Sequence, residues 1–281
     1  MPRTFQTVLS AAILTAVIGF SAGSAVAGPF IIAGTDADDH GFVNGGGNQD
    51  GWFFMQRSLE NIAPGVTNGN KTVIFLGSNP GSDAGNAAQS AFVLSNLPAA
   101  GWTAQFVNGV AAINTFLATG IGSAGIVMLD SGANVTGGID AVESAAVTAG
   151  AVVLNNFLGT GGGLFTQANS LGFLSTLIPG INITTSSGSG ITLTAAGIAA
   201  FPGLTNADLS SGPYHAVFSN FGGLPVLGIE SNRPGGAVII GASGGSITNP
   251  TVVPEPSTLG ILGLGLAALG FIRRRRGAKA A

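Results

Sequence analysis

The residues with the clearest chemical potential lie close together near the start of the chain. The segment GTDADDHG supplies three carboxylates and one imidazole: Asp36, Asp38, Asp39 and His40. Like charges this close repel each other, and a divalent cation would relieve the repulsion. Asp36, Asp38 and His40 have the spacing of the first ligands of a twelve-residue calcium loop, although Gly47 replaces the final glutamate. The sequence therefore predicts a metal site at Asp36, Asp38 and His40, with calcium first; the alternative is a solvated acidic turn.

Other chemically capable residues are scattered. His215 follows a tyrosine and could act as an acid–base group, or it is a hydrogen-bonded loop residue. Trp52, Phe53 and Phe54 could stack on a sugar ring, but such aromatics more often fill a core.

Two further motif matches lack the required context. The segment 241–245 fits G-x-S-x-G, but no helix is expected after it. The segment 120–125 fits G-x-G-x-x-G, but it precedes an expected strand instead of following one. Both are interpreted as turns.

Composition excludes several classes of function. Between residues 28 and 253 there are three basic residues, Arg57, Lys71 and Arg233, against eleven acidic ones. Nucleic acids and anionic lipid headgroups are bound through clustered Lys and Arg, so neither is an expected partner of this region. The chain has no cysteine, which excludes disulfides, thiolate metal sites and a cysteine nucleophile.

The first 27 residues have the organisation of a signal peptide. Arg3 is followed by an apolar run from residue 8 to 20, and Ala25 and Ala27 form an A-x-A site. We expect signal peptidase to cleave after Ala27; the alternative is a retained anchor.

The last residues, 251–281, form a second targeting segment. Residues 257–272 are uncharged and would make a helix of about 24 Å, somewhat short for a hydrocarbon core of about 30 Å. The basic cluster after it is typical of a cytoplasmic stop, and it consists of Arg273, Arg274, Arg275 and Arg276. This pattern predicts one inner-membrane helix with the body exported; the alternative is a buried C-terminal helix.

The order of these features is also specific. Pro254, Glu255 and Pro256 precede the apolar span and the arginine cluster, and this arrangement resembles the PEP-CTERM sorting signal of Gram-negative bacteria. The resemblance implies transient anchoring, processing by exosortase near the PEP motif, and delivery to the cell surface or an extracellular polysaccharide matrix.

Residues 28–250 are expected to form one α/β domain. Apolar runs bounded by turn residues alternate with helical patterns, which favours a mostly parallel sheet with helices on both faces. The expected strands are 72–76, 102–107, 125–130, 161–166, 225–229 and 237–240, and the expected helices are 53–62, 83–98 with Asp83 as cap, 110–117, 139–157 and 193–201.

The span AGIVMLDSGANVTGGIDAVESAAVTAGAVVLNNFLGTGGGLFTQ resembles class I glutamine-amidotransferase-like domains of the trehalose-utilisation type. Two later segments, FPGLT and LPVLGIESN, resemble the last third of that group. The resemblance implies a flavodoxin-like sheet. The resemblance does not imply amidotransferase activity, because those enzymes use a cysteine nucleophile and this chain has no cysteine. The residues that follow the GGGL strand here are Gln167, Ala168 and Asn169, and none of them is a nucleophile or a strong base.

Two functional hypotheses follow. The first is a non-enzymatic surface or matrix protein on a degenerate amidotransferase-like domain. The second is an extracellular hydrolase or carbohydrate-binding enzyme that uses the Asp36–His40 loop together with His215.

Overall fold

The computed structural model describes residues 28–167, 171–186, 188, 190–210, 216–231 and 236–242. The predicted signal peptide, the sorting tail and His215 lie outside these residues, as does Ser243 of the G-x-S-x-G match.

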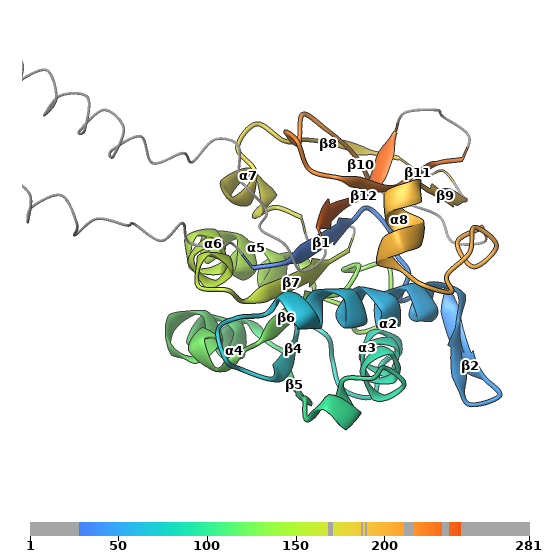
Figure 1. The fold of residues 1–281 in the computed structure, drawn as a ribbon. Helices are drawn as coiled ribbons and strands as arrows, with labels where there is room; N and C mark the ends of the chain where they lie inside the picture. Colours follow the sequence, from blue (N-terminus) through green and yellow to red (C-terminus); the bar gives the residue numbers. More distant parts are fainter. Residues whose placement is uncertain are drawn as a thin grey trace, which may run out of the picture.

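The first half of the main sheet is parallel (Figure 1). Five strands lie in the order β5-β4-β6-β7-β1, and each pairs in parallel with its neighbour. Their bounds are β1 Phe30–Ala33, β4 Thr72–Leu76, β5 Thr103–Val107, β6 Ile126–Leu129 and β7 Gly163–Thr166. All five connect through crossovers on the faces of the sheet, so their carboxyl ends share one edge.

The second half of the same sheet is antiparallel. Its strands are β8 Asn182–Thr185, β9 Ile191–Leu193, β10 Ala216–Ser219, β11 Val226–Glu230 and β12 Ala237–Ala242. β12 pairs antiparallel with β1 and with β11, and Phe30 lies opposite Ala242. The sheet is therefore mixed. The expectation of a mostly parallel sheet holds only for the half from β5 to β1.

The length of one connection explains the antiparallel pairing of β11 with β12. β11 ends at Glu230 and β12 begins at Ala237. A parallel crossover needs about a dozen residues or more, whereas so short a link joins antiparallel neighbours.

Helices cover both faces of the sheet, as the sequence predicts. α2 Asp50–Ile62, α3 Asp83–Val93 and α8 Ala195–Ala200 pack on one face. The other face is covered by α4 Val110–Thr115, α5 Ala141–Ala149, α6 Ala151–Gly159 and α7 Leu174–Leu177. Short helical turns occupy Ala63–Gly65, Pro98–Ala100, Phe116–Gly120 and Ile121–Ser123.

The strands serve both cores because their side chains alternate between the two faces. In β4, Val73 and Phe75 pack with α2 and α3, whereas Ile74 and Leu76 pack with α4 and α5. Since both sets are buried, the strand is apolar throughout, which is the pattern that identified it in the sequence.

Two local expectations are wrong. The helix expected over residues 139–157 is interrupted at Gly150, where a side chain would meet Leu117 at 2.6 Å, and α5 and α6 are bent by 56°. The cap of α3 is Ser82, whose hydroxyl accepts a hydrogen bond from the Gly85 amide at 3.2 Å; Asp83 is the first helical residue.

Among the described residues, no single helix has the length and apolar character needed to span a membrane. The bent α5–α6 pair meets both criteria only when its two helices are taken together.

Candidate functional site

Polar side chains gather at the carboxyl edge of the parallel strands. Ser78 lies two residues beyond β4, Asp130 directly follows β6, and Gln167 directly follows β7. The chain passes from β4 to β5 on one side and returns to β6 on the other, so the edge includes a point where the strand order reverses. Ligands of open α/β sheets bind at such points.

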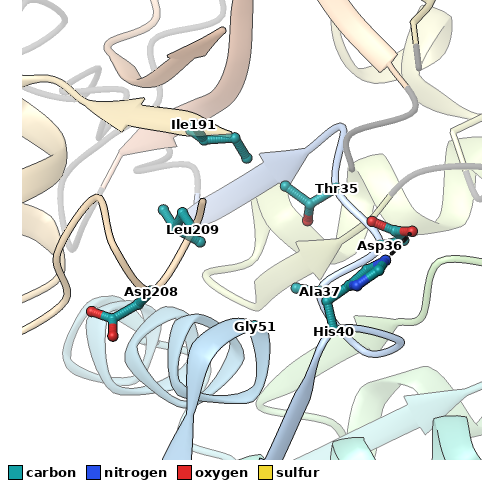
Figure 2. A pocket seen from close by; sticks show the side chains of 8 residues that line it. All are labelled: Thr35, Asp36, Ala37, His40, Gly51, Ile191, Asp208 and Leu209. Carbon is teal, nitrogen blue, oxygen red and sulfur yellow. Dashed lines mark hydrogen bonds and ion pairs between the residues drawn. The ribbon is translucent and has the colours of Figure 1, made fainter. Parts of the chain in front are cut away.

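The loop after β1 contributes an acidic group in which Asp36 is buried, Asp39 is exposed and His40 is half-buried. His40 Nε2 lies 3.1 Å from Asp36 Oδ2 and 4.0 Å from Asp39 Oδ2. One ligand atom from each of these three residues lies within 4.8 Å of the others. Figure 2 shows Asp36 and His40 beside a small depression, which is lined by Thr35, Asp36, Ala37, His40, Gly51, Ile191, Asp208 and Leu209.

Asp38 points away from this group. Its side chain is 2% exposed, and Oδ2 accepts a hydrogen bond from the Ser131 amide at 2.8 Å. The structure thus brings together two residues of the predicted metal set, Asp36 and His40. It places Asp39 with them and Asp38 in a separate, buried cluster.

Burial dominates the electrostatics of that cluster. Burial and, to a smaller extent, the neighbouring Asp130 carboxyl together raise the pKa of Asp38 to about 7, although hydrogen bonds from Ser131 lower it. Burial also raises the pKa of Asp130, to about 6, although hydrogen bonds from Ser78, Ile139 and Gly132 lower it. The pKa of Asp130 is the lower of the two because its carboxylate accepts three hydrogen bonds, at 2.7, 2.9 and 2.9 Å, which stabilise the ionised form.

Asp130 consequently links the loops after β4 and β6 through its hydrogen bonds. It accepts the Ser78 hydroxyl from the loop after β4, and the Gly132 and Ile139 amides from its own loop. Sequence reasoning missed Ser78, Asp130 and Ser131. The available signal was the position of each polar residue immediately beyond a wholly apolar strand.

A hairpin that the sequence analysis did not anticipate fixes the far end of the acidic loop. β2 Gly41–Asn44 pairs antiparallel with β3 Gly47–Gln49, and Gly45 and Gly46 have the positive φ values of 58° and 83° that the tight turn requires. The hairpin projects beyond α2 (Figure 1).

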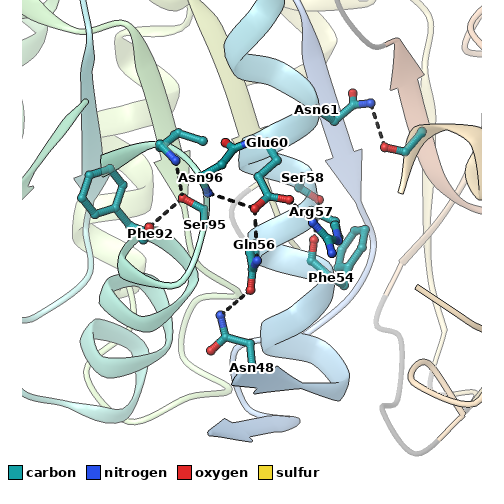
Figure 3. Close-up of polar contacts among 12 residues, drawn as sticks. Asn48, Phe54, Gln56, Arg57, Ser58, Glu60, Asn61, Phe92, Ser95 and Asn96 are labelled. Atoms are coloured by element: carbon teal, nitrogen blue, oxygen red, sulfur yellow. Dashed lines mark hydrogen bonds and ion pairs between the residues drawn. The ribbon is translucent and has the colours of Figure 1, made fainter. Parts of the chain in front are cut away.

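Asn48 attaches this hairpin to two helices. Its amide nitrogen donates to Gln56 Oε1 at 3.0 Å and to the Ser90 carbonyl at 3.1 Å, and the Ser90 hydroxyl donates back to Asn48 Oδ1 at 2.9 Å. Gln56 in turn donates to Glu60, which also accepts the Asn96 amide (Figure 3). A continuous polar network therefore joins the hairpin, α2 and the end of α3.

The aromatic residues proposed as a sugar platform have mainly structural roles. Phe54 is fully buried and packs edge-to-face on Phe165 and Phe201. The Trp52 indole donates to the Asp38 carbonyl at 2.8 Å, and the Phe53 ring lies 4.6 Å from the Arg57 guanidinium carbon. The G-x-G-x-x-G match is a turn before β6, as predicted.

The comparisons with known proteins identify the tail. A family model described as the PEP-CTERM protein-sorting motif matches residues 252–276. No curated protein and no solved structure matches the chain. The motif indicates an exported protein that is sorted by exosortase and passes transiently through the membrane.

The raised pKa of Asp38 predicts a pH-dependent stability. An ordinary Asp has a pKa of 3.8, whereas folded Asp38 holds its proton up to about 7. The folded state therefore binds this proton more tightly, and the contribution of Asp38 lowers the free energy of unfolding by about 3 kcal/mol as the pH rises from 4 to 7. Asp38→Asn removes this fall, so the variant gains stability relative to wild type as the pH rises to 8 in urea titrations.

The control for this experiment is Asp83→Asn, because the Asp83 side chain is exposed. Curves of unfolding free energy against pH that stay parallel for wild type and Asp38→Asn would contradict the prediction.

The Asn48 network predicts a second stability effect. Asn48→Ala removes three hydrogen bonds and leaves the buried Gln56 with an unsatisfied carbonyl, which costs about 2–3 kcal/mol. Urea unfolding measures the loss. Asn44→Ala, at the exposed end of β2, is the matched control and changes stability by less than about 0.5 kcal/mol. Equal effects of the two substitutions would show that the network does not hold the hairpin.

Proposed function

We propose that the chain is a cell-surface or extracellular-matrix protein whose α/β body has no enzymatic activity. The observation that carries this proposal is the sorting motif at residues 252–276. In this scheme signal peptidase removes residues 1–27, residues 257–272 cross the inner membrane, and Arg273–Arg276 stay on the cytoplasmic side. Exosortase then processes the chain near Pro254–Pro256 and releases the body to the surface, where extracellular polysaccharide is a candidate partner.

In this proposal the folded body of the protein is a degenerate amidotransferase-like domain, and the parallel half of its sheet is flavodoxin-like. Two observations support a loss of that chemistry. The chain contains no cysteine, and the residue directly after β7 is Gln167, a buried amide that is neither a nucleophile nor a strong base. The Asp38 and Asp130 carboxylates at this edge are also buried, and Asp130 accepts three hydrogen bonds.

Processing of the tail can be tested by mass spectrometry in a host that has exosortase. Wild-type chain from the surface fraction is expected to lack the arginine cluster. The double substitution Pro254→Ala and Glu255→Ala is expected to leave the intact tail in the membrane fraction. Pro250→Ala, a proline outside the motif, is the matched control and is processed normally. Wild-type surface protein that retains Arg273–Arg276 would contradict the proposal.

The second candidate function is an extracellular hydrolase or carbohydrate-binding enzyme that uses the acidic loop and a divalent cation. The observation in its favour is the convergence of Asp36, Asp39 and His40 within 4.8 Å beside a depression. Two carboxylates and an imidazole suit a divalent cation, with calcium first because oxygen ligands predominate. Asp39 replaces Asp38 in this proposed ligand set.

Isothermal titration with calcium tests the second candidate. Wild-type protein is expected to bind one ion, and Asp39→Asn to bind it at least about tenfold more weakly because a charged ligand is lost. The control is Asp83→Asn, which removes an exposed carboxylate at the start of α3 and should bind calcium like wild type. Absence of heat with the wild-type protein, or an equal loss of calcium affinity in both variants, would contradict the proposed metal site.

A further inference from the structure

Both ends of the folded body lie at one edge of the sheet. Phe30, the first residue of β1, pairs with Ala242, the last residue of β12. This is the amino edge of the parallel strands, opposite the edge that carries Asp36, Asp38 and Asp130. The matched sorting motif begins at residue 252, only ten residues beyond Ala242. The tail therefore starts from the amino edge.

The acidic residues are concentrated at the other edge. All eleven acidic residues between positions 28 and 253 belong to the described part of the chain, and ten of them lie at the carboxyl edge. Five of these ten are exposed or half-buried: Asp39, Asp50, Asp83, Asp140 and Asp208. They lie in the loop after β1, at the starts of α2, α3 and α5, and beside the depression that His40 lines.

The five others at this edge are buried, and they are Asp36, Asp38, Asp130, Glu143 and Glu230. Glu143 belongs to the first turn of α5, and Glu230 ends β11 near the carboxyl end of β1. Within the described part of the chain, the exposed and half-buried carboxylates thus give this edge a negative charge.

The amino edge has a different character. Its one acidic side chain is Glu60, which is paired with Arg57 and accepts the Asn96 amide. Lys71, immediately before β4, is exposed there. Within the described residues, the edge from which the tail starts is therefore close to neutral and carries an exposed cation.

We propose that the amino edge of the sheet is a membrane-facing surface: while the tail is inserted, this edge lies against the anionic lipid headgroups and the acidic carboxyl edge points away from them. The proposal rests on the proposed function, because it requires the tail to be anchored. The region has no cluster of basic residues that would bind lipid headgroups, so the orientation is set by the position of the tail and by repulsion of the exposed carboxylates at the far edge from anionic headgroups. Lys71 is a single cation on the near edge, and its ammonium donates to the Ala100 carbonyl.

The length of the connecting chain supports this orientation. Residues 243–256 separate Ala242 from the expected membrane span. A free chain of this length has a root-mean-square span of about 20 Å, whereas a body of this size is about 40 Å across. To place the carboxyl edge on the membrane, the connection would have to extend around the whole body. The length of the connecting segment and the charge distribution thus both favour the amino edge as the side that faces the membrane.

The absence of cysteine makes the test direct. The full-length chain is reconstituted into vesicles that contain anionic lipid, with one labelled cysteine at Ala99→Cys or at Ala133→Cys. Both alanines are exposed; Ala99 precedes β5 at the amino edge, and Ala133 follows β6 at the carboxyl edge. Energy transfer to a headgroup-labelled lipid is expected to be at least about twofold stronger from position 99, and 1 M salt should narrow the difference because the Debye length falls to about 3 Å.

Equal transfer from both positions, or stronger transfer from position 133, would overturn the orientation. A difference unaffected by salt would overturn its electrostatic basis. Flotation of the vesicles separates this outcome from failure of the proposed function. A chain that does not float with the vesicles is not anchored, whereas a chain that floats with equal transfer from both labels is anchored without the proposed orientation.

Discussion

The hydrogen bonds of two buried carboxyl groups hold together the edge at which this protein carries its candidate chemistry. Asp130 ties the loop after β4 to the loop after β6, and Asp38 ties the loop after β1 to the same point through the Ser131 amide. Three strand ends are thereby fixed relative to each other. The acidic loop owes its position to this arrangement, because Asp38 lies in the middle of it.

The same arrangement divides neighbouring residues between two environments. Asp38 enters the interior, where burial favours its protonated form, while Asp36, Asp39 and His40 gather beside the surface depression. An ionised Asp38 beside Asp130 would have no compensating cation among the described residues. Burial of the Asp38 carboxyl therefore costs free energy when it is ionised. The same loop also brings Asp36, Asp39 and His40 together in a group that attracts cations.

The sequence allowed β4, β6 and β7 to be predicted because each is an apolar run next to glycine. β5 was also predicted, although Thr103 and Gln105 interrupt its apolar residues, whereas no bounds were predicted for β1. The sequence did not reveal β8 and β9, which are short and lie among serine, threonine and glycine residues. It also did not reveal β10, whose apolar run is only three residues long. The candidate site was predicted in part. The clustering of Asp36 and His40 was visible from spacing, but the inward direction of Asp38 depends on Ser131, 93 residues away, and no local pattern encodes that contact.

The pairing of Phe30 with Ala242 has a consequence for the time course of folding. A central strand near the beginning of the body acquires one of its two neighbours from the last described strand, so the most non-local contact of the sheet forms last during synthesis. Contacts of such high sequence separation slow folding. β1 therefore lacks one of its two neighbouring strands until the end of the body has been synthesised.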